Sequence, residues 1–380
     1  MKLPEATGGS LGGGPDMRLK KKAALVSNAA RALIAYRRRR ATVNHFPSYL
    51  WIEPTNRCNL RCVMCPSGAG DVTFGRGFMA LSLFRKIVDE IHPRTSTIVL
   101  ALGGESLLHP GLFEMIRLAA GREVKVHLNT NATLLDREKA EALLASGTSS
   151  VSFAFDGFNK RMYEEARRGA DFESTLDNIL HFLRRKKETG RKRPFTVLSI
   201  LDLGLGVSSP EEKAAFLRNF DGLIDDIHIR RPHSVGPAFL KRRDFKFEVF
   251  DRASGPCGRL WNTLGIAWNG DVLPCTYHMN HEYVLGNVNE MTVAEAWNGP
   301  AMVALRTAWL EGRPLGLSPV CENCAVAGSP KILGIPAGLR SSLADCLTNI
   351  FGYGFEKKVL RLANVVRKGK FTTRPIRAKG

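Results

Sequence analysis

The chain has 380 residues, enough for two domains or for one large domain with an appendage, and 44% of them are hydrophobic, which allows a sizeable core. The formal net charge of +19 is unevenly placed: residues 17–41 hold nine cations and no acid, and residues 356–380 hold nine cations and one acid. No export signal and no membrane-spanning apolar run are visible. We therefore expect a cytoplasmic protein whose eight cysteines bind metal rather than form disulfides.

Taken in chain order, the sequence first predicts a disordered Gly-rich segment at residues 1–16 and a basic N-terminal helix within residues 17–47. Its apolar residues Leu25, Ala29, Ala32 and Tyr36 recur at helical spacing. From Tyr49 on, strands and helices alternate. Strands are predicted at residues 49–54, 96–102, 124–129, 150–155, 195–200 and 226–230, and helices near residues 79–92, 111–121, 136–147, 171–188 and 209–220.

This alternation predicts an α/β fold with parallel strands, either a layer or a partial barrel, over residues 48–235. In such sheets the reactive groups gather at the carboxyl ends of the strands. A linker is predicted at residues 236–256. A small cysteine-containing domain follows at residues 257–330, with a hairpin turn at Asn269-Gly270, and then a basic amphipathic tail at residues 331–380.

Three cysteines, Cys58, Cys62 and Cys65, lie in the stretch NRCNLRCVMCPSG directly after the first predicted strand. Thiolates at this spacing on one loop can bind three corners of an iron–sulfur cluster and leave the fourth iron without a protein ligand. An open coordination position is typical of a reactive metal centre. The alternative is a zinc knuckle with a distant histidine as the fourth ligand.

The Cys58-x3-Cys62-x2-Cys65 motif resembles the signature of the radical S-adenosylmethionine (radical SAM) superfamily. Three further motifs of that family have counterparts here in the right order: ALGGESLLHP at the second strand end, NTNATLL at the third, and FAFDGFNKRMYEEARRGADFE at the fourth. The resemblance covers about residues 48–327. It implies a partial (β/α)6 TIM-like barrel, a SAM-binding 4Fe–4S cluster and an external one-electron donor of the flavodoxin or ferredoxin kind.

The resemblance also implies the residues that bind the cofactor. The three cysteines would hold the cluster, Glu105 would accept a hydrogen bond from the methionine ammonium group, and Arg167 would pair with its carboxylate. For Arg167 a solvated helix charge is the alternative. The full set of cofactor-binding residues is Met64, Gly103, Gly104, Glu105, Asn129, Asn131, Asp156 and Arg167. Ser106, Ala132 and Ala154 depart from the family pattern.

A second cysteine set, Cys257, Cys275, Cys321 and Cys324, has enough thiols to close a metal site completely. A zinc ribbon is one interpretation. Beside a radical SAM domain, the surrounding sequence is similar to the SPASM/twitch extensions of the superfamily. Four thiols fit the shorter twitch type with one auxiliary 4Fe–4S cluster, for which we expect a role in electron transfer. Cys346 is left over and is expected to be an ordinary buried thiol.

The sequence does not define the substrate or an acid–base residue. Arg230, Arg231, His233, Tyr277 and His278 could line a substrate space. We expect an oxidoreductase-type radical enzyme acting on a small or lipid/sugar-linked substrate, with peptide or protein maturation as the alternative. An alternative of another class is a non-enzymatic metal protein whose basic arms bind nucleic acid; the arms lack interleaved aromatic residues, so we do not expect this.

The basic arms favour an anionic membrane surface, because a basic helix with an apolar face can lie in the interface of a bilayer. The protein would then be peripheral at the membrane. The alternative is that both arms pack on the core and leave their charges in water.

Overall fold

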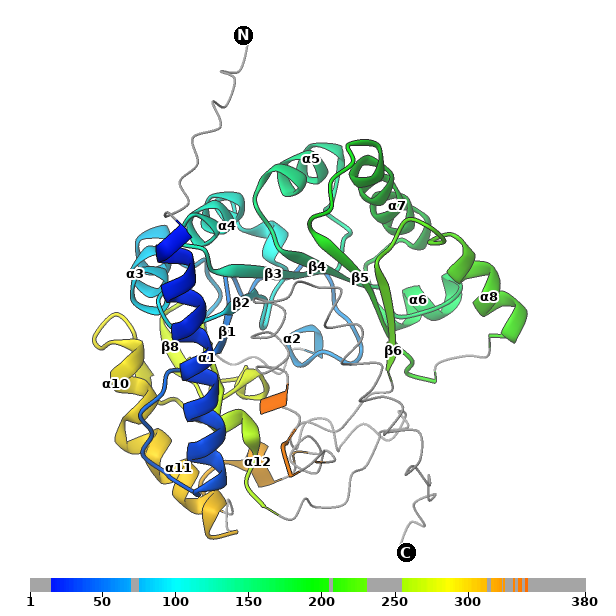
Figure 1. Ribbon diagram of the computed structural model, residues 1–380. Coiled ribbons are helices and arrows are strands. Elements are labelled where there is room, and N and C mark those ends of the chain that lie inside the picture. The colour runs from blue at the N-terminus through cyan, green and yellow to red at the C-terminus, as the bar shows by residue number, and fades with distance from the viewer. Residues whose placement is uncertain are drawn as a thin grey trace, which may run out of the picture.

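The computed structural model describes residues 15–69, 75–204, 208–230, 255–312 and 316–322, together with 324, 331, 334–336 and 339–340. Its centre is a nine-stranded sheet in the order β6-β5-β4-β3-β2-β1-β7-β8-β9. The six strands from β1 to β6 are parallel, and helices cover the outer side of the curved sheet (Figure 1). The predicted α/β partial barrel is confirmed.

All six predicted strands form. They are β1 Tyr49–Ile52, β2 Thr97–Leu100, β3 Lys125–Thr130, β4 Ser150–Ala154, β5 Phe195–Leu201 and β6 Asp226–Arg230. The helices between them are α3 Leu81–Ile91, α4 Leu112–Gly121, α5 Arg137–Ala145, α7 Phe172–Glu188 and α8 Pro210–Arg218. Three short elements follow strand ends and were not predicted: α2 Pro66–Ala69, η1 Ser106–Leu108 and α6 Lys160–Ala166.

The two faces of the strands differ in polarity. Residues such as Leu50, Leu100 and Leu128 are fully buried in the core cluster that the sheet shares with the helices. Alternate residues of β3 point the opposite way, and these include His127 and Asn129, which are only partly buried. The inner face of the barrel is therefore partly polar, as a surface that receives a polar ligand requires.

The cysteine-containing C-terminal region continues the same sheet. It comprises η2 Gly258–Trp261, β7 Thr263–Ile266, β8 Asp271–Leu273, η3 Thr276–His278, β9 Gly286–Asn287, α10 Val293–Asn298, α11 Pro300–Leu310 and α12 Pro319–Glu322. β7 pairs in parallel with β1, so the expected separate small domain is joined to the barrel by backbone hydrogen bonds. This pairing connects segments about two hundred residues apart, and no local pattern reveals it.

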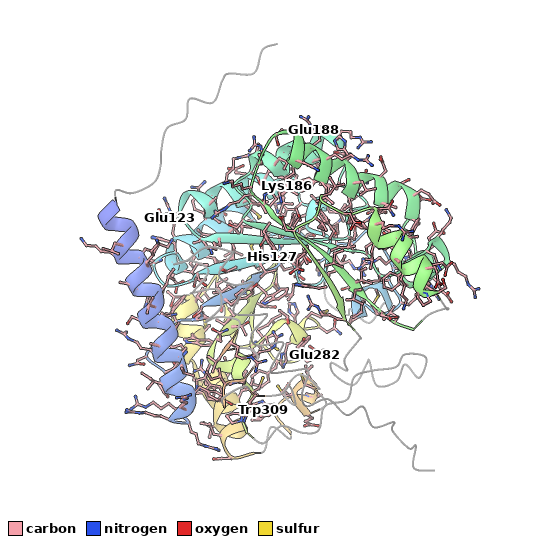
Figure 2. The ribbon with its side chains drawn as sticks, turned by 45° about the vertical axis from the view of Figure 1, so that its right-hand side comes forward. Glu123, His127, Lys186, Glu188, Glu282 and Trp309 are labelled. Carbon is pink, nitrogen blue, oxygen red and sulfur yellow. The ribbon has the colours of Figure 1, made fainter. Side chains whose placement is uncertain are left out.

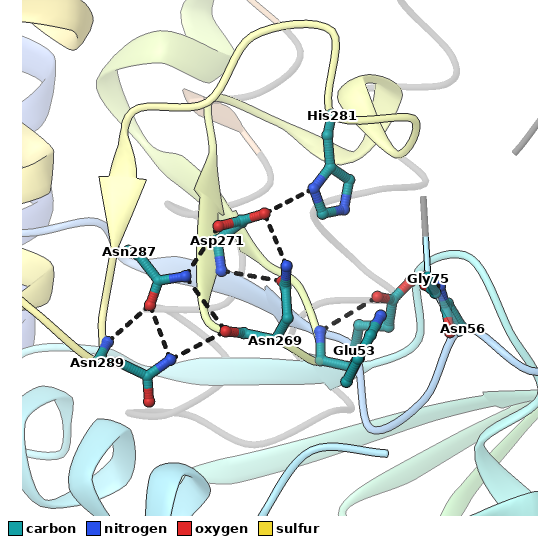
Figure 3. A network of polar contacts seen from close by, with 9 residues as sticks. Glu53, Asn56, Gly75, Asn269, Asp271, His281, Asn287 and Asn289 are labelled. Carbon is teal, nitrogen blue, oxygen red and sulfur yellow. Dashed lines mark hydrogen bonds and ion pairs between the residues drawn. The ribbon is translucent and has the colours of Figure 1, made fainter. Parts of the chain in front are cut away.

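The Asn269-Gly270 turn between β7 and β8 is confirmed, with Gly270 at φ +94°. Asp271 organises this turn, because its carboxylate accepts hydrogen bonds from Asn269 Nδ2, Asn287 Nδ2 and His281 Nδ1, each at 2.8 Å (Figure 3). On the other side of the turn, Glu53 Oε2 accepts a hydrogen bond from the backbone N–H of Trp268 at 3.2 Å. The turn is thereby fixed to the end of β1.

The N-terminal helix α1 spans Pro15–Arg37 and packs on the body of the protein. Leu25, Ala29, Ala32 and Tyr36 are 7% exposed or less. The assignment of this apolar stripe to a membrane was wrong, since the stripe is used for packing against the core. No helix among the described residues has both the length and the apolar character needed to cross a bilayer.

Several predicted segments lie wholly or mostly outside the described residues. They are the disordered start at residues 1–16, the linker at residues 236–256, the tail at residues 331–380, and Cys346 within that tail. Arg231 and His233 also lie outside them.

Candidate active site

The cysteine loop begins at the carboxyl end of β1 and is held from two sides. The backbone N–H groups of Arg61 and Val63 donate to the carbonyls of Arg168 and Ala166 at 2.9 and 3.0 Å, which ties the loop to the end of α6. On the other side, Glu105 N–H donates to the Arg57 carbonyl at 2.8 Å. Met64 is half-buried in the turn between Cys62 and Cys65. The loop is therefore positioned by the ends of β2 and α6.

The thiols of this loop lie in a low-dielectric environment. Cys62 is buried, and this burial raises the pKa of its thiol to about 12 in spite of the nearby Arg167 guanidinium. Burial likewise raises the pKa of Cys58. The nearby Glu105 and Cys65 also raise it, whereas Arg167 lowers it. Only the thiolate binds metal, so metal binding has to displace protons from these cysteines.

The spacing of the sulfur atoms helps to distinguish the two metal hypotheses. Among the described residues, no cysteine belongs to a group of three or more Cys, His, Asp or Glu whose ligand atoms all lie within 4.8 Å of one another. A single tetrahedral zinc, with Zn–S bonds of about 2.3 Å, would hold its thiolates about 3.8 Å apart. In each set of cysteines, at least one pair of sulfur atoms is therefore more than 4.8 Å apart, which is wider than a single zinc ion would hold them.

The Gly-Gly-Glu motif after β2 packs directly on the start of the cysteine loop. A Cβ atom on Gly104 would lie 2.3 Å from the Thr55 carbonyl oxygen and 2.5 Å from that of Arg57. A Cβ on Gly103 would lie 2.7 Å from Glu53 Oε1, which accepts a hydrogen bond from the Gly103 N–H at 2.8 Å. Gly104 is therefore required for this close approach between backbone segments, whereas a Cβ on Gly103 would displace the Glu53 carboxylate from its hydrogen bond.

Glu105 is 3% exposed, and burial raises the pKa of its carboxyl group above the usual value. Its Oε1 accepts hydrogen bonds from Leu107 N–H at 3.0 Å and Thr130 Oγ1 at 2.8 Å, and its Oε2 accepts one from Asn131 N–H at 2.7 Å. A carboxylate offers about four acceptor positions, so Oε2 keeps one for a ligand such as an ammonium group.

The motif after β3 is fixed by its own side chains. Asn131 donates to Asn59 Oδ1 at 3.1 Å, which links it to the cysteine loop. Asn129 Oδ1 is 2.8 Å from His127 Nε2, and the other ring nitrogen of His127 is 2.6 Å from Ser150 Oγ. Ala132, at the position where the family commonly has glycine, adopts a left-handed φ of +61°.

Arg167 and Asp156 form a buried ion pair, with Arg167 Nη2 2.6 Å from Asp156 Oδ2 and side chains 10% and 4% exposed. This arrangement excludes the solvated alternative for Arg167. Asp156 Oδ1 also accepts the Leu201 N–H at 2.8 Å, which ties β4 to β5. Arg167 Nη1 lies 4.0 Å from Cys62 Sγ, and its buried Nε has no hydrogen-bond partner. A cation with an unused donor thus faces the cysteine loop, as the binding of an anionic group requires.

His278 and Arg259 lie close to cysteines of the second set, although the sequence analysis assigned neither of them to that site. His278 is fully buried, with Nδ1 3.4 Å from Cys275 Sγ and Nε2 3.8 Å from Cys321 Sγ. Arg259 lies over the Tyr277 ring at 4.9 Å. Although burial opposes it, the neighbouring Tyr277, Cys275 and Cys257 raise the pKa of the Arg259 guanidinium. Cys324 is half-buried, and it lies close enough to Arg259 to raise the pKa of the guanidinium group as well.

For Arg230, the expected place beside a substrate stays a prediction. This residue is exposed at the carboxyl end of β6, with Nη2 3.5 Å from His228 Nδ1. His278 is fully buried among the second set of cysteines, so it does not line an accessible space; Tyr277 is half-buried beside them, and its place in a substrate space stays a prediction. Their adjacency to Cys275 in the sequence was the signal for this position.

Comparison with known proteins agrees with the motifs. Residues 52–215 match the radical SAM superfamily, and residues 257–325 match the SPASM iron–sulfur cluster-binding domain. The chain is 25% identical over 344 residues to a tungsten-containing aldehyde ferredoxin oxidoreductase cofactor-modifying protein of Pyrococcus furiosus, covering 79% of this chain and 94% of that protein. It is 23% identical over 277 residues to the antilisterial bacteriocin subtilosin biosynthesis protein AlbA of Bacillus subtilis, covering 68% of this chain and 61% of that protein.

Among solved structures, SuiB of Streptococcus suis bound to its precursor peptide SuiA has a TM-score of 0.56 at 15% identity, over 74% of this chain and 71% of that one. This likeness shows the fold. The chain carries a radical SAM domain followed by a C-terminal SPASM domain. The first domain implies a 4Fe–4S cluster and SAM, and the second implies additional iron–sulfur binding.

Proposed function

We propose that this protein abstracts hydrogen from a small or lipid/sugar-linked substrate, in an oxidation or a related radical modification. The observation that carries the proposal is the convergence of three thiols, the Glu105 carboxylate and the Arg167–Asp156 pair at adjacent strand ends. Cys58, Cys62 and Cys65 would hold a 4Fe–4S cluster at this site, and the chemistry that such a cluster would supply is the reductive cleavage of SAM to methionine and a 5′-deoxyadenosyl radical.

Each of these residues has a role that its contacts support. Cys58, Cys62 and Cys65 would hold the cluster and leave one iron for the cofactor. Glu105 would accept a hydrogen bond from the methionine ammonium group through its remaining acceptor position on Oε2. Arg167, kept charged and oriented by Asp156, would pair with the cofactor carboxylate. The side chains of Asn129 and Asn131 lie at the same strand end and would complete the cofactor site.

The second cysteine set would hold one auxiliary 4Fe–4S cluster, because Cys257, Cys275, Cys321 and Cys324 supply all four protein ligands. A fully ligated cluster does not bind substrate directly, so we assign it to electron transfer. The first strand of the C-terminal region, β7, pairs in parallel with β1, and the loop with Cys58, Cys62 and Cys65 follows the carboxyl end of β1. This gives the two sites a fixed relation. A flavodoxin- or ferredoxin-like protein would supply the external electron.

For the substrate, a small molecule is favoured over a peptide. The relative that the chain matches over 94% of its length is named for the modification of a cofactor. Peptide maturation remains the second candidate, because AlbA is named for bacteriocin biosynthesis. The peptide-bound SuiB structure adds a shared fold, and a shared fold does not define the substrate.

Anaerobic reconstitution with iron and sulfide tests the proposal. We expect about eight irons per chain and formation of 5′-deoxyadenosine from SAM on reduction. Four irons or fewer together with bound zinc would instead support a non-enzymatic metal protein. A panel of polyols, lipid-linked sugars and short peptides then separates the substrate classes by which of them increases deoxyadenosine formation.

The double variant Cys321→Ala/Cys324→Ala tests the assigned role of the auxiliary cluster. We expect it to cleave SAM without substrate turnover, because the cysteine loop is intact while the electron path is broken. Full substrate turnover by this variant would contradict the electron-transfer role. A thermal melt of the variant controls for destabilisation, since metal binding also contributes to folding.

A further inference from the structure

We propose that the outward face of α1 docks on an anionic lipid surface. This face, called here the outer stripe, consists of Leu19, Val26 and Ile34, which are 67%, 43% and 50% exposed. Residues seven or eight positions apart lie on the same side of an α-helix, because the helix has about 3.6 residues per turn. The outer stripe is therefore a continuous apolar line along the helix and not a set of scattered side chains.

The outer stripe lies opposite the face that holds α1 to the protein. On the inner face Asn28 donates to the Phe46 carbonyl at 2.9 Å, and Tyr36 donates to the Pro256 carbonyl at 3.0 Å. Near the start of the helix, Lys21 donates to the Arg122 and Glu123 carbonyls at 2.7 and 2.8 Å. Figure 2 shows α1 at the margin of the molecule, with side chains directed away from the body. Core packing thus accounts for one apolar face and leaves the second unexplained.

Exposed cations flank the outer stripe. Lys22 lies on one side of it, Arg31 and Arg38 lie on the other, and Arg37 continues its line at the end of the helix. All four are exposed, in a segment from residue 17 to residue 41 that contains no acid. Cations beside an anionic leaflet are attracted to it, while apolar side chains on the same face can enter the boundary between headgroups and acyl chains.

Charge complementarity favours an anionic lipid surface over the other candidate partners of the outer stripe. A second copy of the same face would bring cation against cation, and residues 356–380 of this chain hold nine cations and one acid. Nucleic acid would attract the cations but has no use for an apolar stripe. The docking stands independently of the proposed reaction, and it would bring a lipid-linked substrate to the enzyme.

Co-sedimentation of the full chain with vesicles tests the proposal, using phosphatidylcholine alone and phosphatidylcholine mixed with phosphatidylglycerol. We expect binding to the mixed vesicles only. The variants Leu19→Ser/Val26→Ser/Ile34→Ser and Lys22→Glu/Arg31→Glu/Arg37→Glu should each bind them at least roughly tenfold more weakly. Because these positions are exposed, both variants should keep the wild-type melting temperature.

The matched control is Arg85→Glu/Arg117→Glu/Arg184→Glu, which makes the same change in net charge at exposed positions of α3, α4 and α7. This variant should bind like the wild type. Equal binding by the two α1 variants and the wild type would overturn the proposal. So would failure of the wild type to bind anionic vesicles, or α1-dependent binding to duplex DNA in place of vesicles.

Discussion

Arg167 Nη2 lies 2.6 Å from Asp156 Oδ2, where the ends of β4 and α6 meet under the cysteine loop. Both side chains are so deeply buried that water could not take the place of either partner if that partner were removed. Removing one member of a buried pair leaves an uncompensated charge, which costs more than the pair itself contributes. The pair therefore acts as a unit that holds a cation beside the thiols.

For this reason, Asp156→Asn should lower the free energy of unfolding of the cluster-free protein by about 3 kcal/mol, measured by urea denaturation under anaerobic reducing conditions. The double variant Asp156→Asn/Arg167→Met should recover part of this loss, because no charge is then left buried. If the double variant were less stable than the sum of the two single variants implies, the coupling inferred from the geometry would be wrong.

Replacing Cys58, Cys62 and Cys65 by alanine should reduce the iron content by about half and abolish deoxyadenosine formation. The second cysteine set should keep its iron, since it lies in a separate part of the fold. Iron analysis and detection of deoxyadenosine by chromatography measure the two effects. Cys346→Ala, outside both motifs, is the control and should retain both. Deoxyadenosine from the triple variant would disprove the assignment of the reactive cluster.

Glu53 predicts a pH dependence of stability. Burial raises the pKa of this carboxyl group from 4.5 to about 7, although it accepts hydrogen bonds from the Trp268 and Gly103 N–H groups. Folding thus favours the protonated form, so the contribution of Glu53 to stability is greatest below pH 4.5 and falls as the pH rises to about 7. The loss should be about 3 kcal/mol.

The difference in unfolding free energy between the wild type and Glu53→Gln isolates this contribution, because other carboxyl groups are common to both. We expect the wild type to lose stability relative to the variant across this pH range. A difference that does not vary with pH would show that Glu53 ionises normally in the folded protein.

Ala132→Gly should raise the free energy of unfolding by about 0.5 kcal/mol. The left-handed φ of +61° at Ala132 costs an L-residue roughly 1–2 kcal/mol, of which the entropy of glycine in the unfolded chain cancels a part. Ala140→Gly, inside α5, is the opposite control and should lower stability by about 1 kcal/mol. Thermal denaturation of both variants measures the contrast, and destabilisation by Ala132→Gly would contradict it.

The parallel strands and the candidate cluster ligands were predictable because both leave local signals. Apolar runs separated by helical segments marked β1 to β6, and the short spacing of Cys58, Cys62 and Cys65 marked the loop. The strand ends brought Glu105, Asn131 and Asp156 to the same edge, as parallel topology requires.

Other features depend on contacts between distant parts of the chain. No local pattern reveals the pairing of β7 with β1, the position of Glu53 between Gly103 and Trp268, or the half-buried position of Arg259 close to the second set of cysteines. The sequence alone did not show whether Arg167 is solvated or buried, because its pairing with Asp156 depends on the fold. The helical spacing of α1 revealed one apolar face, and only its packing showed that Leu19, Val26 and Ile34 form another.

β1 is hydrogen-bonded to β2 on one side and to β7 on the other along Tyr49–Ile52. A gene truncated before Cys257 would therefore not encode a smaller version of the enzyme. It would leave β1 as a bare edge that invites pairing with other chains, and the product would aggregate. We therefore expect the barrel and the cysteine-containing C-terminal region to fold as one unit. Exchange of the C-terminal region between relatives would succeed only where the incoming β7 fits the same strand.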